Sequence, residues 1–365
     1  MKTILFEETL KRDIPLVIVE VWYNILTHDL SHFFGFQFPE VIFAHQNGVA
    51  ISYRIPAIFH QKIPLKIAGW LQKENNKEKL KKMFDDFVQT YPIIHKKNSN
   101  LQPTKEVAQC IKEINRAIDF WAKGISGDII AFWLPVWNHN HKEKSGVSLY
   151  SDEVLARAEK SRKECDKIFD EAGDIVYYYL AQLAQLLNLP AESTRFLLLS
   201  EINESSTTDT NNILKKWEAR SQGYAYIGGM LVSPAEFQKT IEKKRYIIKE
   251  EKTENIQQIS GVSAYNGNVK GKAKIILTRA QFQKLLPGDV LVASMTTPMY
   301  YSIMEKAAAF VTDEGGLLCH AAIVSREMKK PCIISTKIAT KVLNDEDFIE
   351  VDADEGVIKI LKKAI

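Results

Sequence analysis

The 365-residue chain has few cysteines, no long apolar run and little excess of charge of either sign. Its four cysteines are Cys110, Cys165, Cys319 and Cys332. They show neither the paired spacing of a zinc site nor the density of a secreted disulfide framework, which indicates reduced thiols in a cytoplasmic protein. The densest apolar stretch, Ile129 to Trp137, is too short to span a bilayer and contains Pro135. We therefore expect no membrane association.

The charge balance argues against a second class of partner. Lys and Arg together number 48, Asp and Glu number 45, and the formal net charge is +3. This is too balanced to predict a nucleic-acid-binding surface. With 45% hydrophobic and 25% charged residues, the composition is that of an ordinary globular protein, and the length predicts two or three domains.

The chain also lacks recognisable metal and nucleotide motifs. His28 and His32 have helical metal-ligand spacing, but no glutamate of the metalloprotease type lies between them. His139 and His141 have no evident third ligand, so a surface loop is the simpler interpretation. Gly228-Gly229 is an isolated diglycine. We expect no metal site and no cofactor bound by this chain itself.

What the chain does contain is a change of pattern along its length. Residues 1–95 are predicted to be a mixed α/β region, in which Asn47-Gly48 is typical of a hairpin turn. Residues 96–248 are predicted to be a mainly helical connector. Residues 249–258 are polar and charged and are predicted to be a linker. Residues 259–365 alternate short strands with short helices, so the expected class is α+β with several domains.

Two apolar stripes predict long helices in the middle region. One begins at Val107, passes Trp121 and is predicted to end at Gly124, because glycine commonly follows a helix end. The other begins near Asp152, which is predicted to be its N-cap, and continues to Leu187. Such stripes are more often core seams than ligand sites.

The most informative stretch is Asp313 to Glu327, which follows a predicted strand at 308–312. It contains the diglycine Gly315-Gly316 and then His320 at the expected start of a helix. Amides at a helix start and the positive end of its dipole favour an anion. A neutral imidazole can attack phosphorus and hold the phosphoryl group covalently. The pattern predicts a phosphohistidine site, with a hydrogen-bonded structural histidine as the open alternative.

The chemistry of phosphoryl transfer points to the residues that would bind phosphate. The candidate backbone donors are Gly315, Gly316, Leu317 and Cys319. Thr296, with Thr297 beside it, offers a hydroxyl, and turn capping is the alternative. Arg326 either pairs with Asp313 or Glu314 and braces the loop, or reaches a phosphate. Cys319 is either a small residue beside the histidine or a thiol of lowered pKa.

Motifs on both sides of this stretch resemble one known family. They are Gly261 to Ile276, similar to an entry hairpin; Pro287 to Val292, a proline-glycine-aspartate turn and strand; Thr296 to Pro298, a threonine-proline loop; Arg326-Glu327 with Pro331, the end of a catalytic helix; and Val351-Asp352 with Gly356 to Ile358, a closing hairpin. In this order they resemble the swivelling phosphohistidine domain of the phosphoenolpyruvate-utilising enzymes. The resemblance implies a swivelling β/β/α domain over residues 259–365 and identifies His320 as its phosphorylated residue.

The chain departs from the family pattern at three places. The residues before the histidine are commonly threonine and then serine or cysteine, whereas here they are Leu318 and Cys319. Loss of the threonine hydroxyl removes a possible donor to the phosphoryl group or the imidazole. Lys329-Lys330 stands before the proline where glycine is frequent, and Asp345 to Asp347 replaces a glycine-containing turn. None of these changes removes the nucleophile.

The resemblance implies a phosphotransferase component that carries a phosphoryl group on His320 between a donor site and an acceptor site. The expected donor is Mg-ATP or phosphoenolpyruvate. We find neither an ATP-grasp domain nor a phosphoenolpyruvate-binding barrel, so the expected partners are a separate ATP-grasp subunit and an unknown small-molecule acceptor. The alternative is a catalytically silent binding or regulatory protein that retains the fold. A third possibility is a transferase with an acceptor pocket lined by Trp70, Trp121, Trp133 and Trp137.

Overall fold

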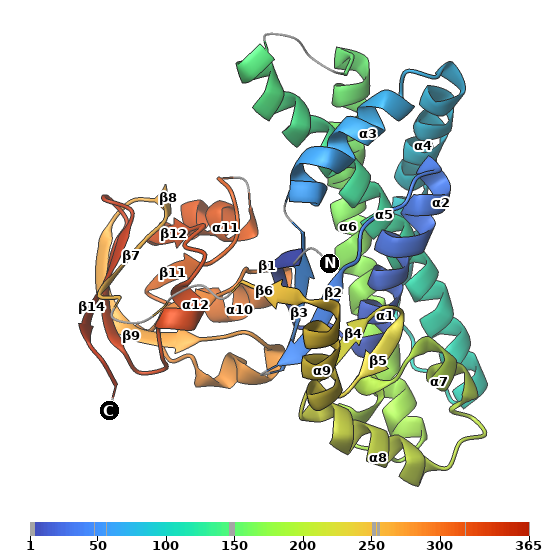
Figure 1. The fold of residues 1–365 in the computed structure, drawn as a ribbon. Coiled ribbons are helices and arrows are strands. Elements are labelled where there is room, and N and C mark those ends of the chain that lie inside the picture. Colours follow the sequence, from blue (N-terminus) through green and yellow to red (C-terminus); the bar gives the residue numbers. More distant parts are fainter. Residues whose placement is uncertain are drawn as a thin grey trace. The chain divides into compact units, whose positions relative to one another are not determined.

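The computed structural model describes residues 4–46, 48–55, 57–145, 150–249, 253, 256–317 and 319–364. The side chains of residues 10, 57, 60, 132–133, 135–145, 163, 166 and 170 are outside this description. The chain divides into two compact units (Figure 1). Unit 1 comprises residues 1–10 and 14–249, and unit 2 comprises residues 11–13 and 250–365. Helices and sheets occur in both units, so the chain is of the α+β class.

Unit 1 contains a six-stranded sheet with the order β5-β4-β2-β3-β1-β6. Its strands are β1 Ile4–Arg12, β2 Ile42–Gln46, β3 Val49–Arg54, β4 Tyr224–Ile227, β5 Met230–Val232 and β6 Tyr246–Ile248. The β2–β3 hairpin predicted around the asparagine-glycine turn is confirmed by their antiparallel pairing, and Gly48 has a φ of 83°. Asn47 lies outside the described residues. The strands come from both ends of the unit, since β4 pairs with β2 and β6 pairs with β1.

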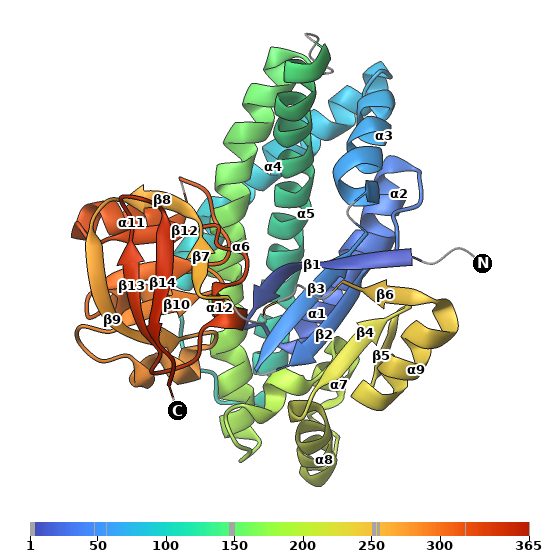
Figure 2. The ribbon, with the colours of Figure 1, turned by 60° about the vertical axis from the view of Figure 1, so that its left-hand side comes forward.

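Nine α-helices of unit 1 are described. They are α1 Leu16–Asn24, α2 Leu30–Phe34, α3 Ile63–Trp70, α4 Glu74–Asn98, α5 Val107–Ser145, α6 Asp152–Leu186, α7 Leu199–Glu204, α8 Thr210–Ser221 and α9 Pro234–Lys244. Figures 1 and 2 show α5 and α6 running side by side. None of the described helices is long and apolar enough to cross a membrane.

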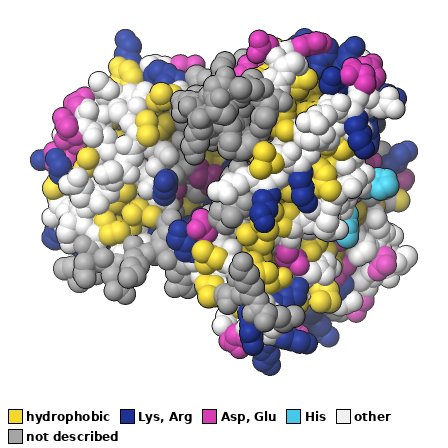
Figure 3. All heavy atoms as spheres, turned by 45° about the horizontal axis from the view of Figure 1, so that its top comes forward, with side chains coloured by type: hydrophobic (Ala, Val, Ile, Leu, Met, Phe, Trp, Pro, Cys, Tyr) yellow, Lys and Arg dark blue, Asp and Glu magenta, His cyan; other side chains and the backbone are white. Residues whose placement is uncertain are grey.

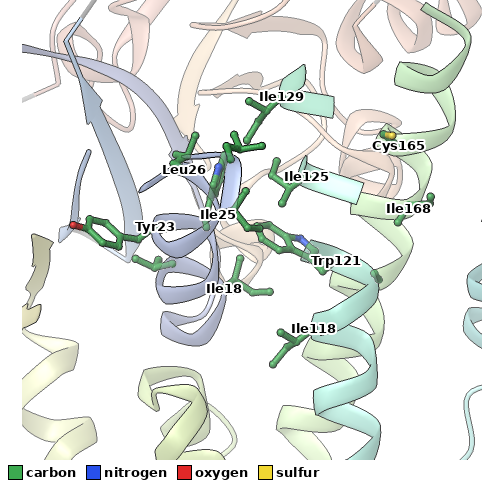
Figure 4. Packing of buried hydrophobic residues seen from close by; sticks show 14 of the residues in the cluster. Ile18, Tyr23, Ile25, Leu26, Ile118, Trp121, Ile125, Ile129, Cys165 and Ile168 are labelled. Carbon is green, nitrogen blue, oxygen red and sulfur yellow. The ribbon is translucent and has the colours of Figure 1, made fainter. Parts of the chain in front are cut away.

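One apolar core joins the helices and the sheet of unit 1. Its buried side chains extend from Leu16 to Tyr226 and so come from both sides of residue 95. Around Trp121, close packing brings together α1, α5 and α6 (Figure 4). Trp121 meets Trp22 at a ring-centroid distance of 5.8 Å, whereas Trp70 meets Phe34 at 4.9 Å in a separate aromatic group. The side chains of residues 133 and 137 are not described, and the division into separate domains at residue 95 stays a prediction.

The prediction that Gly124 ends a helix is wrong, because α5 continues through it to Ser145. A Cβ atom at Gly124 would lie 2.7 Å from Ile168 Cγ2, and one at Gly127 would lie 2.4 Å from Cys165 Sγ. These glycines allow α5 and α6 to approach closely, and packing outweighs their low helix propensity. The predicted N-cap is also corrected by one position, since the Ser151 side chain accepts the hydrogen bond from the Val154 amide.

Unit 2 is built on an eight-stranded sheet with the order β7-β14-β13-β9-β10-β11-β12-β8. Its strands are β7 Gln258–Ser260, β8 Val262–Tyr265, β9 Asn268–Ile275, β10 Val290–Ala293, β11 Ala309–Thr312, β12 Cys332–Ile334, β13 Phe348–Asp352 and β14 Val357–Lys362. Its described α-helices are α10 Tyr301–Met304, α11 His320–Met328 and α12 Ala339–Val342. The four strands β9 to β12 are parallel, and the predicted closing hairpin is the antiparallel pair β13–β14.

The predicted entry hairpin is not a hairpin. Its two strands pair with different partners, because β8 pairs with β12 and β9 pairs with β10 and β13. β7 and β8 stand at opposite ends of the sheet order and are joined through Gly261 alone. A Cβ atom there would lie 2.6 Å from the Ile334 carbonyl oxygen, so a glycine is required at this corner.

Alternate residues of the parallel strands enter two different cores. Val290 and Val292 of β10 face one cluster that includes Ile349 and Ile358. Leu291 of β10 faces the other cluster, which also contains apolar residues of α10 and α11. This alternation is the two-residue period of a strand buried on both faces. It holds the parallel strands rigidly and fixes where their carboxyl ends lie.

Candidate functional site

The candidate site lies at the carboxyl ends of the parallel strands of unit 2. The loops that follow β10, β11 and β12 are joined by backbone hydrogen bonds. Asp313 donates to the Ala293 carbonyl at 3.1 Å, Glu314 to that of Ser294 at 2.8 Å, and Thr336 to that of Thr312 at 3.1 Å. This edge is where open α/β sheets usually bind ligands.

His320 is the first residue of α11, as the sequence predicts, and Cys319 is its N-cap. The imidazole is half-buried, and its Nδ1 atom lies 2.9 Å from Thr296 Oγ1. Burial lowers the pKa of His320, so the neutral ring predominates at neutral pH. The structure therefore brings together two predicted site residues, the histidine and the threonine hydroxyl, from loops after neighbouring strands.

The diglycine loop has one glycine that its geometry requires. Gly315 has a φ of 121°, and a Cβ atom there would lie 2.7 Å from Cys319 Sγ, whereas one at Gly316 would meet open space. Among the described residues, the amides of Gly315, Gly316 and Leu317 have no hydrogen-bond acceptor. The Cys319 amide donates to the Gly316 carbonyl at 2.9 Å, so it is already used inside the loop. The Cys319 thiol lies against Gly315.

Arg326 braces the loop, but with a partner other than the two carboxylates considered from the sequence. Its Nη2 atom donates to the Leu317 carbonyl at 2.8 Å. Asp313 instead accepts hydrogen bonds from the hydroxyls of Thr336, at 2.9 Å, and Thr340. Burial raises the pKa of Asp313, and these hydrogen bonds oppose the shift. The interactions of Thr336 and Thr340 were not predicted, because nothing local in the sequence links them to residue 313.

The departures from the family pattern have structural counterparts. Lys329, at the C-cap of α11, has a φ of 53°, and Glu346 has a φ of 72°, so two non-glycine residues occupy the left-handed region. Lys330 Nζ donates to three carbonyls, including that of Ala307 at 2.6 Å. Leu318 lies outside the described residues. The Thr297 hydroxyl is buried with no hydrogen-bond partner among the described residues.

Metal ligands do not gather elsewhere in the described part of the chain. No group of three or more His, Cys, Asp or Glu side chains able to hold a metal was found among the described residues. His28 and His32 are both exposed, and the side chains of His139 and His141 are not described. The lone diglycine Gly228-Gly229 forms the turn between β4 and β5. On the face seen in Figure 3, charges of both signs are interspersed.

A known family model matches part of unit 2, and two relatives match about a third of the chain. Residues 285–356 match the model of the "PEP-utilising enzyme, mobile domain" family. A "probable phosphoenolpyruvate synthase" of Archaeoglobus fulgidus is 43% identical over 122 residues, which are 33% of this chain and 16% of that protein. The "uncharacterized phosphotransferase YvkC" of Bacillus subtilis is 43% identical over 119 residues, which are 32% of this chain and 14% of that protein.

One solved structure with wide coverage is an NMR structure of Enzyme I (nEIt). It covers 78% of this chain and 79% of its own, at 14% identity and a TM-score of 0.20, which is too low to support a common fold. The chain matches less than a fifth of the length of the two relatives above. The residues that match the family model include His320 at the carboxyl edge of the parallel sheet, so unit 2 contains a mobile domain of the phosphoenolpyruvate-utilising enzymes.

Proposed function

We propose that this chain is a phosphotransferase component that carries a phosphoryl group on Nε2 of His320. The observation that carries the proposal is the 2.9 Å contact between Thr296 Oγ1 and His320 Nδ1 at the start of α11. In the productive tautomer Nδ1–H donates to the threonine oxygen. The Nε2 lone pair is then free to attack phosphorus. Thr296 thus fills the orienting role that a hydroxyl before the histidine would otherwise have.

The transfer step uses the neutral imidazole. Nε2 forms a bond to phosphorus while the bond from phosphorus to the donor oxygen breaks, and the donor leaves with that electron pair. Nδ1 keeps its proton during this step, so the first product is a phosphorylated imidazolium that still donates to Thr296. Release of that proton to solvent then gives the phosphoramidate with a neutral ring. The free amides of Gly315, Gly316 and Leu317 are the proposed ligands of the equatorial oxygens. Arg326 would act indirectly, since it holds the Leu317 carbonyl.

We further propose that donor and acceptor sites belong to partners or to other domains. Relatives named phosphoenolpyruvate synthase support phosphoenolpyruvate or Mg-ATP as the donor, and a separate ATP-grasp subunit would supply the nucleotide site. Four exposed apolar side chains lie close in sequence to Thr296 or His320 and support docking of another protein surface there. They are Met299 at 37%, Tyr301 at 45%, Leu317 at 53% and Ile323 at 44% exposure. We also propose that this domain swivels between the donor site and the acceptor site.

The proposal is tested by labelling without any partner. The small phosphoryl donor phosphoramidate, labelled with ³²P, should give an acid-labile, base-stable adduct on the wild-type chain and none on His320→Ala. Because the pKa of His320 is lowered, the rate should be constant near neutral pH. It should fall only when the pH drops below the usual imidazole value of about 6.5 and protonates the ring.

Labelled ATP, with candidate partners, and labelled phosphoenolpyruvate then identify the natural donor. Label that persists in His320→Ala would reject the assignment of the nucleophile. A wild-type chain that accepts no label from phosphoramidate would favour the silent binding or regulatory protein instead. Circular dichroism of His320→Ala shows whether the variant is folded, so loss of label is not confused with unfolding.

A further inference from the structure

The loop after β12 has an unusual backbone beside the candidate site. Ser335 has a φ of 60° and Lys337 a φ of 68°, although neither is a glycine. Non-glycine residues occupy this left-handed region at a cost in free energy, and such residues are concentrated at functional sites. Ser335 and Lys337 both have this conformation at the carboxyl edge of the parallel strands, which indicates a functional role for the loop.

Hydrogen bonds hold this loop directly against the phosphohistidine loop. The Lys337 amide donates to the Asp313 carbonyl at 3.0 Å. From the other side, the Asp313 carboxylate accepts from Thr336 Oγ1 at 2.9 Å and from the Thr340 amide at 3.3 Å. Asp313 is only two residues before Gly315. The backbone of Lys337 is thus fixed one hydrogen bond from the segment that leads into the diglycine turn.

The lysine side chain is left available in this arrangement. Lys337 is exposed, and among the described residues its ammonium group has no hydrogen-bond or ion-pair partner. Two other cations contact the loop, and both are already engaged. Arg326 donates to the Leu317 carbonyl, and Arg12 of unit 2 pairs with the Glu314 carboxylate at 3.0 Å. The Asp313 carboxylate is buried and hydrogen-bonded to threonines, so it does not compete for the amine. A flexible four-carbon stem on a rigid backbone can bring this charge to an anion at the loop.

We infer that Lys337 is an anion-binding residue of the phosphoryl-transfer site. Its ligand is the phosphate group of a phosphate ester or polyphosphate donor as that donor approaches His320. The inference deepens the proposed phosphoryl-carrier function and rests on it for the identity of the ligand. Hydrogen bonds to Asp313 hold the strained loop, and with it the backbone of Lys337, at the site. The lysine supplies a positive charge that the neutral imidazole and the backbone amides do not.

The experiment uses the full chain with inorganic phosphate as the probe. Binding is followed by the NMR shifts of the Gly315 and Gly316 amides in wild type, Lys337→Asn and Lys337→Gly. Asparagine and glycine both tolerate a positive φ, so the amine is lost while the backbone is kept. Each variant should bind phosphate about fivefold more weakly at low ionic strength, the effect of one near-surface charge. The difference should fall below about twofold in 1 M salt.

The chain offers a matched control in Lys329. It is also an exposed lysine in the left-handed region, but it caps the other end of α11 from His320. Lys329→Asn should bind phosphate as wild type does, and Lys337→Arg should keep most of the affinity. Unchanged binding in both neutral Lys337 variants, equal weakening in Lys329→Asn, or no phosphate binding to wild type would each overturn the inference.

This readout separates the inference from the function on which it rests. Phosphate binding requires no covalent chemistry, so it should depend on Lys337 in His320→Ala as well. If phosphoramidate fails to label His320 but phosphate binding still depends on Lys337, the carrier function fails and the anion site stands. If phosphoramidate labels His320 but phosphate binding does not depend on Lys337, the carrier function stands and the anion site fails.

Discussion

The two units differ in how far apart in sequence their essential contacts lie. In unit 2 the parallel strands β9 to β12 follow one another in the chain and are neighbours in the sheet in the same order. In unit 1 the sheet joins β1 to β6 and β2 to β4, although β3 ends at Arg54 and β4 begins at Tyr224. Successive strand–turn–helix segments leave local signatures, whereas pairing across such a separation leaves none.

The site shows the same contrast on a smaller scale. The glycine turn and the helix start at His320 form one continuous segment, so they can be recognised from the sequence. The contacts from Thr296 to His320 and from Thr340 to Asp313 join separate loops. These loops meet only because the parallel sheet brings the ends of its strands to one edge. The following predictions test whether each unit depends on the contacts that distinguish it.

The largest effect is expected from overpacking the helix pair of unit 1. In Gly127→Ala the new Cβ would lie 2.3 Å from Phe87 and 2.4 Å from Cys165, so unit 1 should lose about 3 kcal/mol. All six tryptophans precede residue 218, so urea unfolding followed by tryptophan fluorescence reports on unit 1. Gly173→Ala in α6 is the control, because its Cβ would meet Trp121 only at 3.9 Å. It should be stabilising. Equal stability of the two variants would contradict the packing role of Gly127.

The next effect concerns a long-range charge network of unit 1. Burial alone would raise the pKa of Glu201, but hydrogen bonds from Arg220 and Lys216 and from the Leu198 amide lower it to about 2. The ionised form is thus favoured by folding. This contribution is complete above pH 4.5, the unperturbed value, and is lost as the pH falls through 4.5 towards 2. Glu201→Gln should cost about 2 kcal/mol at pH 7.

The difference between Glu201→Gln and wild type, measured as above, should shrink steadily between pH 4.5 and pH 2.5. A difference that is independent of pH would show that the carboxylate charge is not responsible. Glu192→Gln is the matched control, because Glu192 forms an exposed pair with Arg195 three residues away. It should change the free energy of unfolding by less than about 0.5 kcal/mol.

In unit 2, the contact between Thr296 and His320 is expected to affect the rate of phosphoryl transfer more than the stability of the fold. Thr296→Val removes the hydroxyl that orients Nδ1 of His320, so labelling by phosphoramidate should slow by about tenfold, or 1.4 kcal/mol. Thr297→Val is the control, since that hydroxyl is buried without a described partner and its removal should be nearly neutral. A normal rate in Thr296→Val would mean that another group orients the ring.

The smallest effect on stability is expected at Lys329, whose backbone has a conformation typical of glycine. Lys329 has a φ of 53° at the C-cap of α11. Lys329→Gly should stabilise unit 2 by about 0.5–1 kcal/mol, because relief of strain outweighs the added freedom of the unfolded chain. Hydrogen exchange of amides in β10 and β11 measures this in unit 2 alone. Faster exchange in the variant would indicate that the lysine side chain contributes a contact of its own.

The sequence determined much of unit 2. The strand expected after the proline-glycine-aspartate turn is β10, β13 and β14 form the predicted hairpin, and His320 begins its helix. Apolar runs bounded by turns and a glycine before a helix are local signals that physical chemistry interprets directly. The family resemblance rests on the same local signals.

Only the tertiary structure decided the remainder. Gly124 ends no helix, because a partner helix needs the space of its missing side chain. β8 pairs with β12 instead of its neighbour β9, and the close approach at Gly261, where the chain passes from β7 to β8, leaves no room for a side chain. Thr296, Asp313 and Lys337 meet at one edge because a parallel sheet aligns the ends of strands that the sequence keeps apart. Burial and proximity belong to the folded chain, and no local pattern encodes them.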